Sequence, residues 1–227
     1  MPNGWVTVFG SSRVGPHDAV YRDAVRLGSL LAHAGYTLCT GGYTGVMEAI
    51  SRGAVEAGGR AVGVTVTSWA ARLRPNRWVT EEVVAPDLFQ RIARMTAADA
   101  YVAMPGGLGT LGEVALTWNL FQTESVPRRP FVLVGPAWRA LLDCLPAAVR
   151  IEPRDLGLVR LVERVDDVVE AIRGGRAVSG RPRTPGSIPG ATGPGETPSS
   201  HQPTRAVPHR PERKTRSLGR RKHRSKR

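Results

Sequence analysis

Residues 105–113 read Pro-Gly-Gly-Leu-Gly-Thr-Leu-Gly-Glu and point more directly to chemistry than any other part of the chain. An apolar strand pattern precedes this segment and a helical pattern follows it, so glycines join a strand to a helix. Glycines there let a ligand approach the backbone, and the free N–H groups at the helix start favour an anion. The segment matches neither GxGxxG nor the GxxxxGK motif of P-loops, which favours a simple phosphate group. We expect Gly106, Gly107, Gly109 and Thr110 to hold that phosphate; the alternative is a tight turn without a ligand.

Two more strand-like runs end in small residues. The run at 6–9 is followed by Gly10, Ser11 and Ser12, and the run at 36–40 by a glycine-rich segment. In a parallel sheet the carboxyl ends of the strands meet at one edge, where ligands bind. The sequence therefore predicts that these segments line the same site, although glycines are also used for close packing of helix and strand. The candidate residues of the second segment are Gly41, Gly42, Gly45 and Met47.

Glu113 and Arg91 are the charged candidates near the 105–113 segment. Thr110 and Glu113 have the spacing of a capping box, in which each side chain accepts a hydrogen bond from a backbone N–H at the helix start. Alternatively, the carboxylate of Glu113 faces the ligand one turn from the phosphate. Arg91 precedes the strand at 100–104, and its simple interpretation is a solvated surface side chain. The pattern alone leaves the two alternatives for Glu113 open.

The elements that must position these residues alternate between strand and helix. Region 67–86 has no clear periodicity and is predicted to be an exposed loop that could serve as a lid. The alternation predicts an α/β fold, a Rossmann-like doubly wound parallel sheet with helices on both faces. The predicted strands are 6–9, 36–40, 61–66, 100–104 and 131–134, and the predicted helices are 18–34, 45–57, 88–97, 110–122, 137–145 and 165–173.

Charge divides the chain of 227 residues into two unequal parts. The formal net charge is +13, of which residues 1–173 contribute +1 and residues 174–227 contribute +12. The second part also holds 8 Pro and 8 Gly and no aromatic residue. It cannot bury enough apolar surface to offset the entropy of ordering it. We therefore expect a near-neutral domain at 1–173 and a disordered, Pro/Gly-rich, polybasic tail at 174–227.

The basic end of that tail suggests a partner of its own. Fourteen basic residues without interleaved aromatics favour weak, non-specific contact with nucleic acid through phosphates. The alternative is a solubilising extension without a ligand.

Several classes of protein are excluded by composition. No apolar run approaches the roughly 20 residues of a membrane span, and no signal peptide is recognisable, so we expect a cytoplasmic protein that does not contact a membrane. The two cysteines are isolated, which argues against a zinc site or a disulfide framework. All three lysines fall after residue 173, which argues against a pyridoxal-phosphate enzyme. We expect no metal and no cofactor.

Gly41-Gly42 with Gly45-Val46-Met47, followed by PGGLGTLGE at 105–113, resembles the LOG ("lonely guy") family of Rossmann-like proteins over about residues 5–150. The resemblance implies a phosphoribohydrolase, which cleaves the N-glycosidic bond of a nucleoside 5′-monophosphate, such as AMP or a cytokinin riboside monophosphate, to base and ribose 5-phosphate. It implies Arg91 and Glu113 as catalytic residues, Thr110 and the 106–109 backbone as the phosphate site, and residues 10–12 as part of the pocket. It also implies a homodimer and no cofactor.

The chain departs from the family pattern at several positions. Ile92 follows Arg91 where cytokinin-activating members carry Lys, and Gly112 stands where they carry a first acidic residue. Residues 45–49 are similar to a neighbouring branch that includes molybdenum-cofactor carrier proteins. A non-catalytic carrier of a nucleotide or of molybdopterin, on the same fold, is therefore the alternative function.

Overall fold

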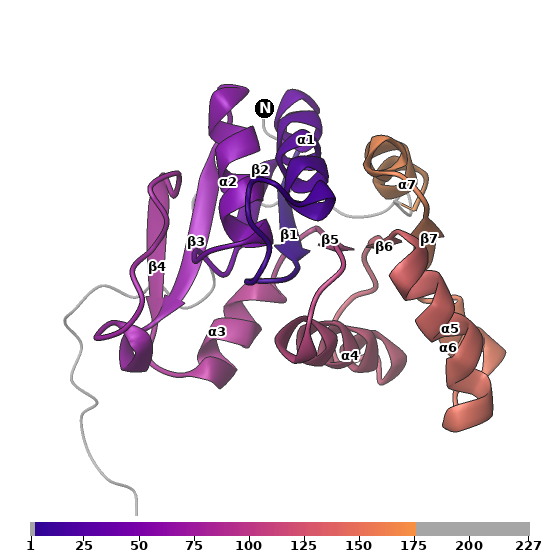
Figure 1. Cartoon of the computed structure of the whole chain (residues 1–227). Coiled ribbons are helices and arrows are strands. Elements are labelled where there is room, and N and C mark those ends of the chain that lie inside the picture. The colour runs from indigo at the N-terminus through magenta and orange to yellow at the C-terminus, as the bar shows by residue number, and fades with distance from the viewer. Residues whose placement is uncertain (1–2, 176–227) are drawn as a thin grey trace, which may run out of the picture. The chain divides into compact units, whose positions relative to one another are not determined.

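The computed structural model of this protein describes residues 3–175 and contains one parallel sheet of seven strands (Figure 1). The residues predicted to form a polybasic tail lie, from 176 onward, outside the described residues. The strands are ordered β4-β3-β2-β1-β5-β6-β7 across the sheet. Their bounds are β1 Trp5–Phe9, β2 Thr37–Thr40, β3 Ala61–Val66, β4 Glu81–Ala85, β5 Ala100–Ala103, β6 Phe131–Val134 and β7 Arg160–Val162.

The five predicted strands all form, and they are the central ones. Strands β2, β3, β5 and β6 are buried at every residue, and β1 at all but its first. Short runs rich in Val suit this position, because a parallel strand covered on both faces needs apolar side chains pointing both ways.

Two edge strands were not predicted, and the expectation that 67–86 is all loop was wrong for residues 81–85. The first four residues of strand β4 alternate between half-exposed and exposed, Ala85 is buried, and the strand pairs in parallel with β3. Its acidic side chains are satisfied by neighbours: Glu81 pairs with Arg60 at 2.6 Å, and Glu82 accepts a hydrogen bond from Thr65. A short strand with charged residues on an edge gives a weak apolar pattern, which is why its sequence resembles a loop.

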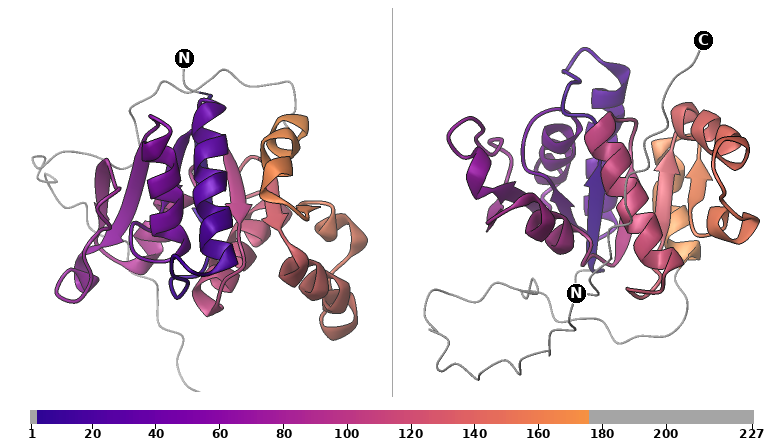
Figure 2. Two further views of the ribbon diagram at one scale, coloured as in Figure 1. Left: turned by 45° about the horizontal axis from the view of Figure 1, so that its top comes forward. Right: turned by 90° about the horizontal axis from the view of Figure 1, so that it is seen from below.

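Helices cover both faces of the sheet, as predicted (Figures 1 and 2). One core cluster joins α1, α2 and α7 to the sheet, and a second joins α3, α4 and α5 to its opposite face. The bounds of the helices are α1 Ala19–His33, α2 Val46–Glu56, α3 Leu88–Met95, α4 Leu108–Gln122, α5 Pro136–Ala148, α6 Pro153–Leu156 and α7 Val168–Gly174, with short 3-10 turns η1 at Thr67–Trp69 and η2 at Val165–Asp167.

The strand order reverses at β1. The chain proceeds from β1 outward through β2, β3 and β4, then returns to the other side of β1 with β5. The segments that follow β1 and β5 therefore diverge to opposite faces and leave a crevice between them, the usual ligand site of doubly wound sheets. This topology brings the glycine segments after β1, β2 and β5 to one edge.

Candidate active site

The three glycine segments contact one another at this edge. The backbone N–H of Ser11 donates to the carbonyl of Pro105 at 3.2 Å, and the N–H of Val46 donates to the carbonyl of Ser11 at 2.8 Å. The hydroxyl of Thr44 donates to the carbonyl of Ser12 at 3.0 Å. The loop after β1 is thus hydrogen-bonded to the loops that follow β2 and β5.

The glycines of the site divide into two groups. Side chains added at Gly10 or Gly45 would overlap Val46 or the Ser11–Ser12 backbone, and Gly45 also has a positive φ of 72°. These two glycines allow close packing between loops, which was the alternative left open by the sequence. By contrast, a side chain at Gly107 or Gly109 would meet nothing within 4 Å. The exposed backbone of these two glycines is the part of the site open to a ligand.

The open glycines lie at the start of α4. Gly107 is the N-cap and offers no side chain to the first N–H groups, so those of Leu108, Gly109 and Thr110 remain unsatisfied within the helix. A helix of 15 residues adds its dipole to these donors. The arrangement is a cradle for an anion such as phosphate.

The capping box of Thr110 and Glu113, one of the two alternatives left open by the sequence, does not form. Because α4 begins at Leu108, Thr110 is already the third helical residue and is buried against Gly106. Glu113 lies one turn further along α4. Its carboxylate is therefore left for another role.

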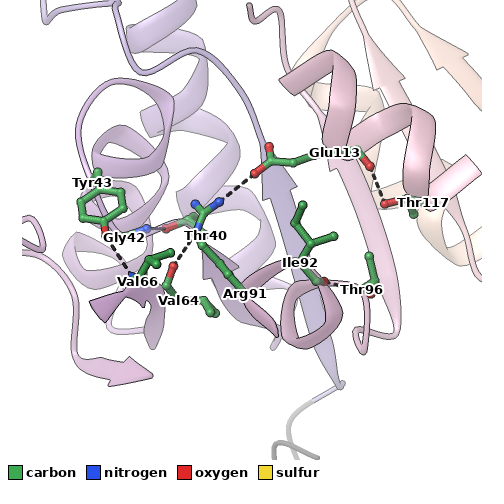
Figure 3. Close-up of polar contacts among 10 residues, drawn as sticks. All are labelled: Thr40, Gly42, Tyr43, Val64, Val66, Arg91, Ile92, Thr96, Glu113 and Thr117. Carbon is green, nitrogen blue, oxygen red and sulfur yellow. Dashed lines mark hydrogen bonds and ion pairs between the residues drawn. The ribbon is translucent and has the colours of Figure 1, made fainter. Parts of the chain in front are cut away.

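Glu113 forms an ion pair with Arg91 (Figure 3). Nη1 of Arg91, on α3, lies 3.1 Å from Oε1 of Glu113, on α4. Both side chains are largely buried, with exposed fractions of 6% for Arg91 and 15% for Glu113. The alternative of a solvated surface arginine is therefore excluded, because α3 turns Arg91 inward onto the sheet edge.

Arg91 is held on three further sides. Its Nε donates to the carbonyl of Val64 at 2.8 Å, as Figure 3 shows. A side chain at Gly41 would overlap both the guanidinium group and the sulfur of Met47, so Arg91 rests directly on the Gly41 backbone. The ring of Trp69 lies 5.7 Å from the guanidinium carbon, within the range of a cation–π contact.

Burial raises the pKa of Glu113 above its ordinary value, and the positive charge of Arg91 opposes that rise. Loss of hydration disfavours the charged carboxylate, whereas the adjacent guanidinium favours it. A carboxylate tuned in this way, beside an anion cradle, can accept a proton or stabilise developing positive charge.

Some contributors to the site carried no recognisable sequence signal. The carbonyl of Val64 acts through the backbone, which any residue supplies. Trp69 and Asn76 fall in the aperiodic segment predicted to be a loop. Asn76 donates to the carbonyls of Gly42 and Tyr43 at 3.0 and 2.9 Å and so fixes the segment that follows β2.

Other classes of site find little support among residues 3–175. No group of three or more His, Cys, Asp and Glu side chains there is arranged to hold a metal ion, and Cys39 and Cys144 are unpaired thiols. Within the same range no helix is long and apolar enough to cross a membrane.

Comparison with known proteins identifies relatives of this chain. Residues 47–172 match a family model described as "possible lysine decarboxylase". A cytokinin riboside 5′-monophosphate phosphoribohydrolase of Rhodococcoides fascians is 32% identical over 178 residues, covering 74% of this chain and 88% of that protein. A protein of the same name from Mycobacterium tuberculosis is 28% identical, covering 68% and 86%. Among solved structures, the molybdenum cofactor binding protein of Rippkaea orientalis superposes with a TM-score of 0.61 at 25% identity, covering 77% and 98%.

Proposed function

The chain belongs to the LOG family, and we propose that it hydrolyses the N-glycosidic bond of a nucleoside 5′-monophosphate to a free base and ribose 5-phosphate. The observation that carries this proposal is the buried Arg91–Glu113 pair, one helical turn from the anion cradle of α4. The names of the two phosphoribohydrolase relatives support the same reaction.

Each group of the site has a role in this reaction. The N–H groups of Leu108, Gly109 and Thr110 bind the 5′-phosphate, which places the ribose beside Glu113. Cleavage develops positive charge on the sugar ring, and the carboxylate of Glu113 stabilises it. Glu113 also orients a water and accepts its proton, so that the hydroxyl bonds to the anomeric carbon as the bond to the base nitrogen breaks. The base leaves with the electron pair of that bond and takes up a proton.

Arg91 sets the charge state of this carboxylate. Its guanidinium favours the ionised form of Glu113, because it opposes the rise in pKa that burial causes. The remaining candidates from the sequence support the site rather than the chemistry: Gly10, Ser11, Ser12, Gly42 and Gly45 shape the loops, while Gly41 and Met47 seat Arg91.

A carrier protein is the second candidate function. The similarity to the molybdenum cofactor binding protein at 25% identity favours it, and an anion cradle would serve a carrier as well as an enzyme. A carrier does not require a carboxylate held ionised by a buried arginine. The Arg91–Glu113 pair therefore favours hydrolysis.

The proposal extends to the assembly of the protein. Helix α4 is apolar on most of its surface and exposes Leu108 and Leu111, and the start of α3 exposes Leu88 and Phe89. Leu108 and Phe89 have exposed fractions of 85% and 84%. Exposed apolar side chains of this size on adjacent helices suit burial against a second copy, and we propose a homodimer.

The composition of the chain supports a cytoplasmic location. The basic residues of the segment 205–227 support weak contact with nucleic acid.

The test is a panel of nucleoside 5′-monophosphates incubated with the purified protein, with free base as the readout. We expect release of base from at least one monophosphate and none from the matching nucleosides, since these lack the group that the α4 cradle binds. Binding of monophosphates without release of base would favour the carrier. Equal affinity for AMP and adenosine would contradict the assignment of the start of α4 as a phosphate site.

A further inference from the structure

We propose that the base of the bound nucleotide stacks on Trp69, which makes this residue a determinant of which ligands the site retains. This inference rests on the proposed function. Trp69 ends the η1 turn directly after β3, at the same edge of the sheet as the glycine segments. Nothing in the catalytic chemistry described above requires an aromatic residue there.

The position of Trp69 follows the order of groups in a nucleotide. The anion cradle lies after β5, Glu113 lies one turn further along α4, and Arg91 reaches from Glu113 to the carbonyl of Val64 on β3. The Trp69 ring lies 5.7 Å beyond, over the guanidinium of Arg91. Phosphate, ribose and base succeed one another in the same order, so a nucleotide whose sugar contacts Glu113 directs its base toward Trp69.

Trp69 is supported by a buried aromatic neighbour and is itself only half-buried. The ring of Tyr43 packs against it with centroids 5.8 Å apart and an angle of 45° between the rings. Tyr43 itself is buried and fixed, because its hydroxyl accepts a hydrogen bond from the backbone N–H of Val66 at 3.0 Å (Figure 3). Trp69 is half-buried, so part of its side chain remains accessible to a ligand.

The consequence is selective retention of ligands that carry a base. Stacking on an aromatic side chain changes affinity by about 5- to 150-fold per base and tolerates every base, since all have a flat π-face. Ribose 5-phosphate has no base and gains nothing from Trp69. The site therefore distinguishes substrate from sugar product by this contact, and product leaves more readily.

The experiment measures affinity for AMP and for ribose 5-phosphate by calorimetry. It uses the full-length chain carrying Glu113→Gln, so that AMP is not consumed during the titration. On that background Trp69→Ala is expected to weaken AMP binding by about 5- to 150-fold and ribose 5-phosphate binding by less than about twofold. Trp69→Phe should retain most of the AMP affinity.

Trp78→Ala is the matched control. Trp78 belongs to the same segment but stacks on Arg77 and Arg52, at 4.8 and 5.9 Å, and not on Arg91. It should leave both affinities unchanged. Equal weakening of both ligands by Trp69→Ala would assign Trp69 a structural role, and unchanged AMP affinity would exclude stacking; either result overturns the inference.

Hydrolysis by the parent chain, assayed in parallel, separates this inference from the proposed function. Binding of AMP that depends on Trp69, without hydrolysis by the parent, would reject the enzyme and keep the stacking contact. If the parent hydrolyses AMP but Trp69→Ala leaves the AMP affinity unchanged, the proposed enzyme is kept and the stacking contact is rejected. Absence of AMP binding to the parent would overturn both.

Discussion

The backbone of Gly41 forms the seat on which the guanidinium group of Arg91 rests. A methyl group added at Gly41 would overlap Nη2 of Arg91 and crowd the sulfur of Met47. Arg91 is held from its other sides by the carbonyl of Val64 and the carboxylate of Glu113, so it cannot move without losing a partner. We therefore propose that the glycine that follows β2 acts on the site by positioning Arg91.

Gly41→Ala should consequently lower kcat by tenfold or more while the chain remains folded. A displaced Arg91 no longer opposes the rise in the pKa of Glu113, and a loss of about tenfold corresponds to about 1.4 kcal/mol of transition-state stabilisation. Steady-state kinetics and circular dichroism measure the two quantities. Gly112→Ala is the control, because a side chain there meets nothing within 4 Å; it should leave kcat unchanged and stabilise α4 by up to about 1 kcal/mol. Equal kcat values for Gly41→Ala and Gly112→Ala would contradict the role of Gly41 in positioning Arg91.

Glu113→Gln should reduce hydrolysis by about a hundredfold or more, the contribution of one positioned acid–base group. It should leave the free energy of unfolding within about 1 kcal/mol, because burial already disfavours the charged form of Glu113 and the amide keeps a hydrogen-bond acceptor for Arg91. AMP binding should persist, since the cradle of α4 is untouched. Free-base assays, denaturant titration and calorimetry measure these effects. Turnover at the parent rate would show that the carboxylate has only a structural role.

The pH dependence of activity should report the raised pKa of Glu113. Only the ionised carboxylate accepts a proton, so activity is expected to fall with decreasing pH at a midpoint above the ordinary pKa of glutamate. Arg91→Gln removes the charge that opposes this rise and should move the midpoint to still higher pH. Profiles of kcat/KM against pH for parent and variant provide the test, and a shift toward lower pH would contradict the assignment.

The contribution of Glu113 to stability should fall as pH rises, whereas activity should rise. A carboxyl group whose pKa is raised in the folded state binds its proton more tightly there than in the unfolded state. Its contribution is therefore fully present below the ordinary pKa of glutamate and is lost as pH rises through the raised value. The unfolding free energy of the parent, measured relative to that of Glu113→Gln across that window, should fall as pH rises. A constant difference would show that Glu113 titrates normally.

Phe89→Asp should dissociate the proposed homodimer. Phe89 is 84% exposed, and a charge placed in an apolar interface is costly to bury. Sedimentation velocity should show the parent as a dimer and the variant as a monomer at the same concentration. Val149→Asp, which alters another exposed apolar residue at the end of α5, should leave the dimer intact. A monomeric parent would contradict the proposal.

Removing residues 176–227 should leave the melting temperature within about 2 °C, which for a chain of this size corresponds to less than about 1 kcal/mol. That segment is expected to add charge without apolar contacts. The shortened chain should also lose any binding to nucleic acid, and the binding of the full chain should weaken steeply with salt. Calorimetric melting and filter binding at several salt concentrations check both effects. Salt-insensitive binding retained by residues 1–175 would place the contact in the domain.

The sequence by itself determined the central sheet, the paired strand–glycine–helix units and the edge at which they meet. Apolar runs such as 61–66 and 131–134 are local signals, because burial on both faces demands them. It also singled out Arg91 and Glu113, through the motif that Glu113 shares with the LOG family. What it left open was whether Glu113 caps α4 or faces a ligand, and whether Arg91 lies on the surface.

Only the tertiary structure decided these alternatives. Arg91 and Glu113 lie on separate helices, and their contact depends on how α3 and α4 pack on one face of the sheet, which local patterns do not encode. The N-cap of α4 is Gly107, three residues before Thr110, which excludes the capping box; helix ends read from sequence are uncertain by about 2–4 residues. Trp69 and the carbonyl of Val64 join the site through an aperiodic turn and a backbone atom. Neither belongs to a motif that can be recognised in the sequence. Each reaches the site because it lies on β3 or directly after it, and not because of the residue types beside it in the chain.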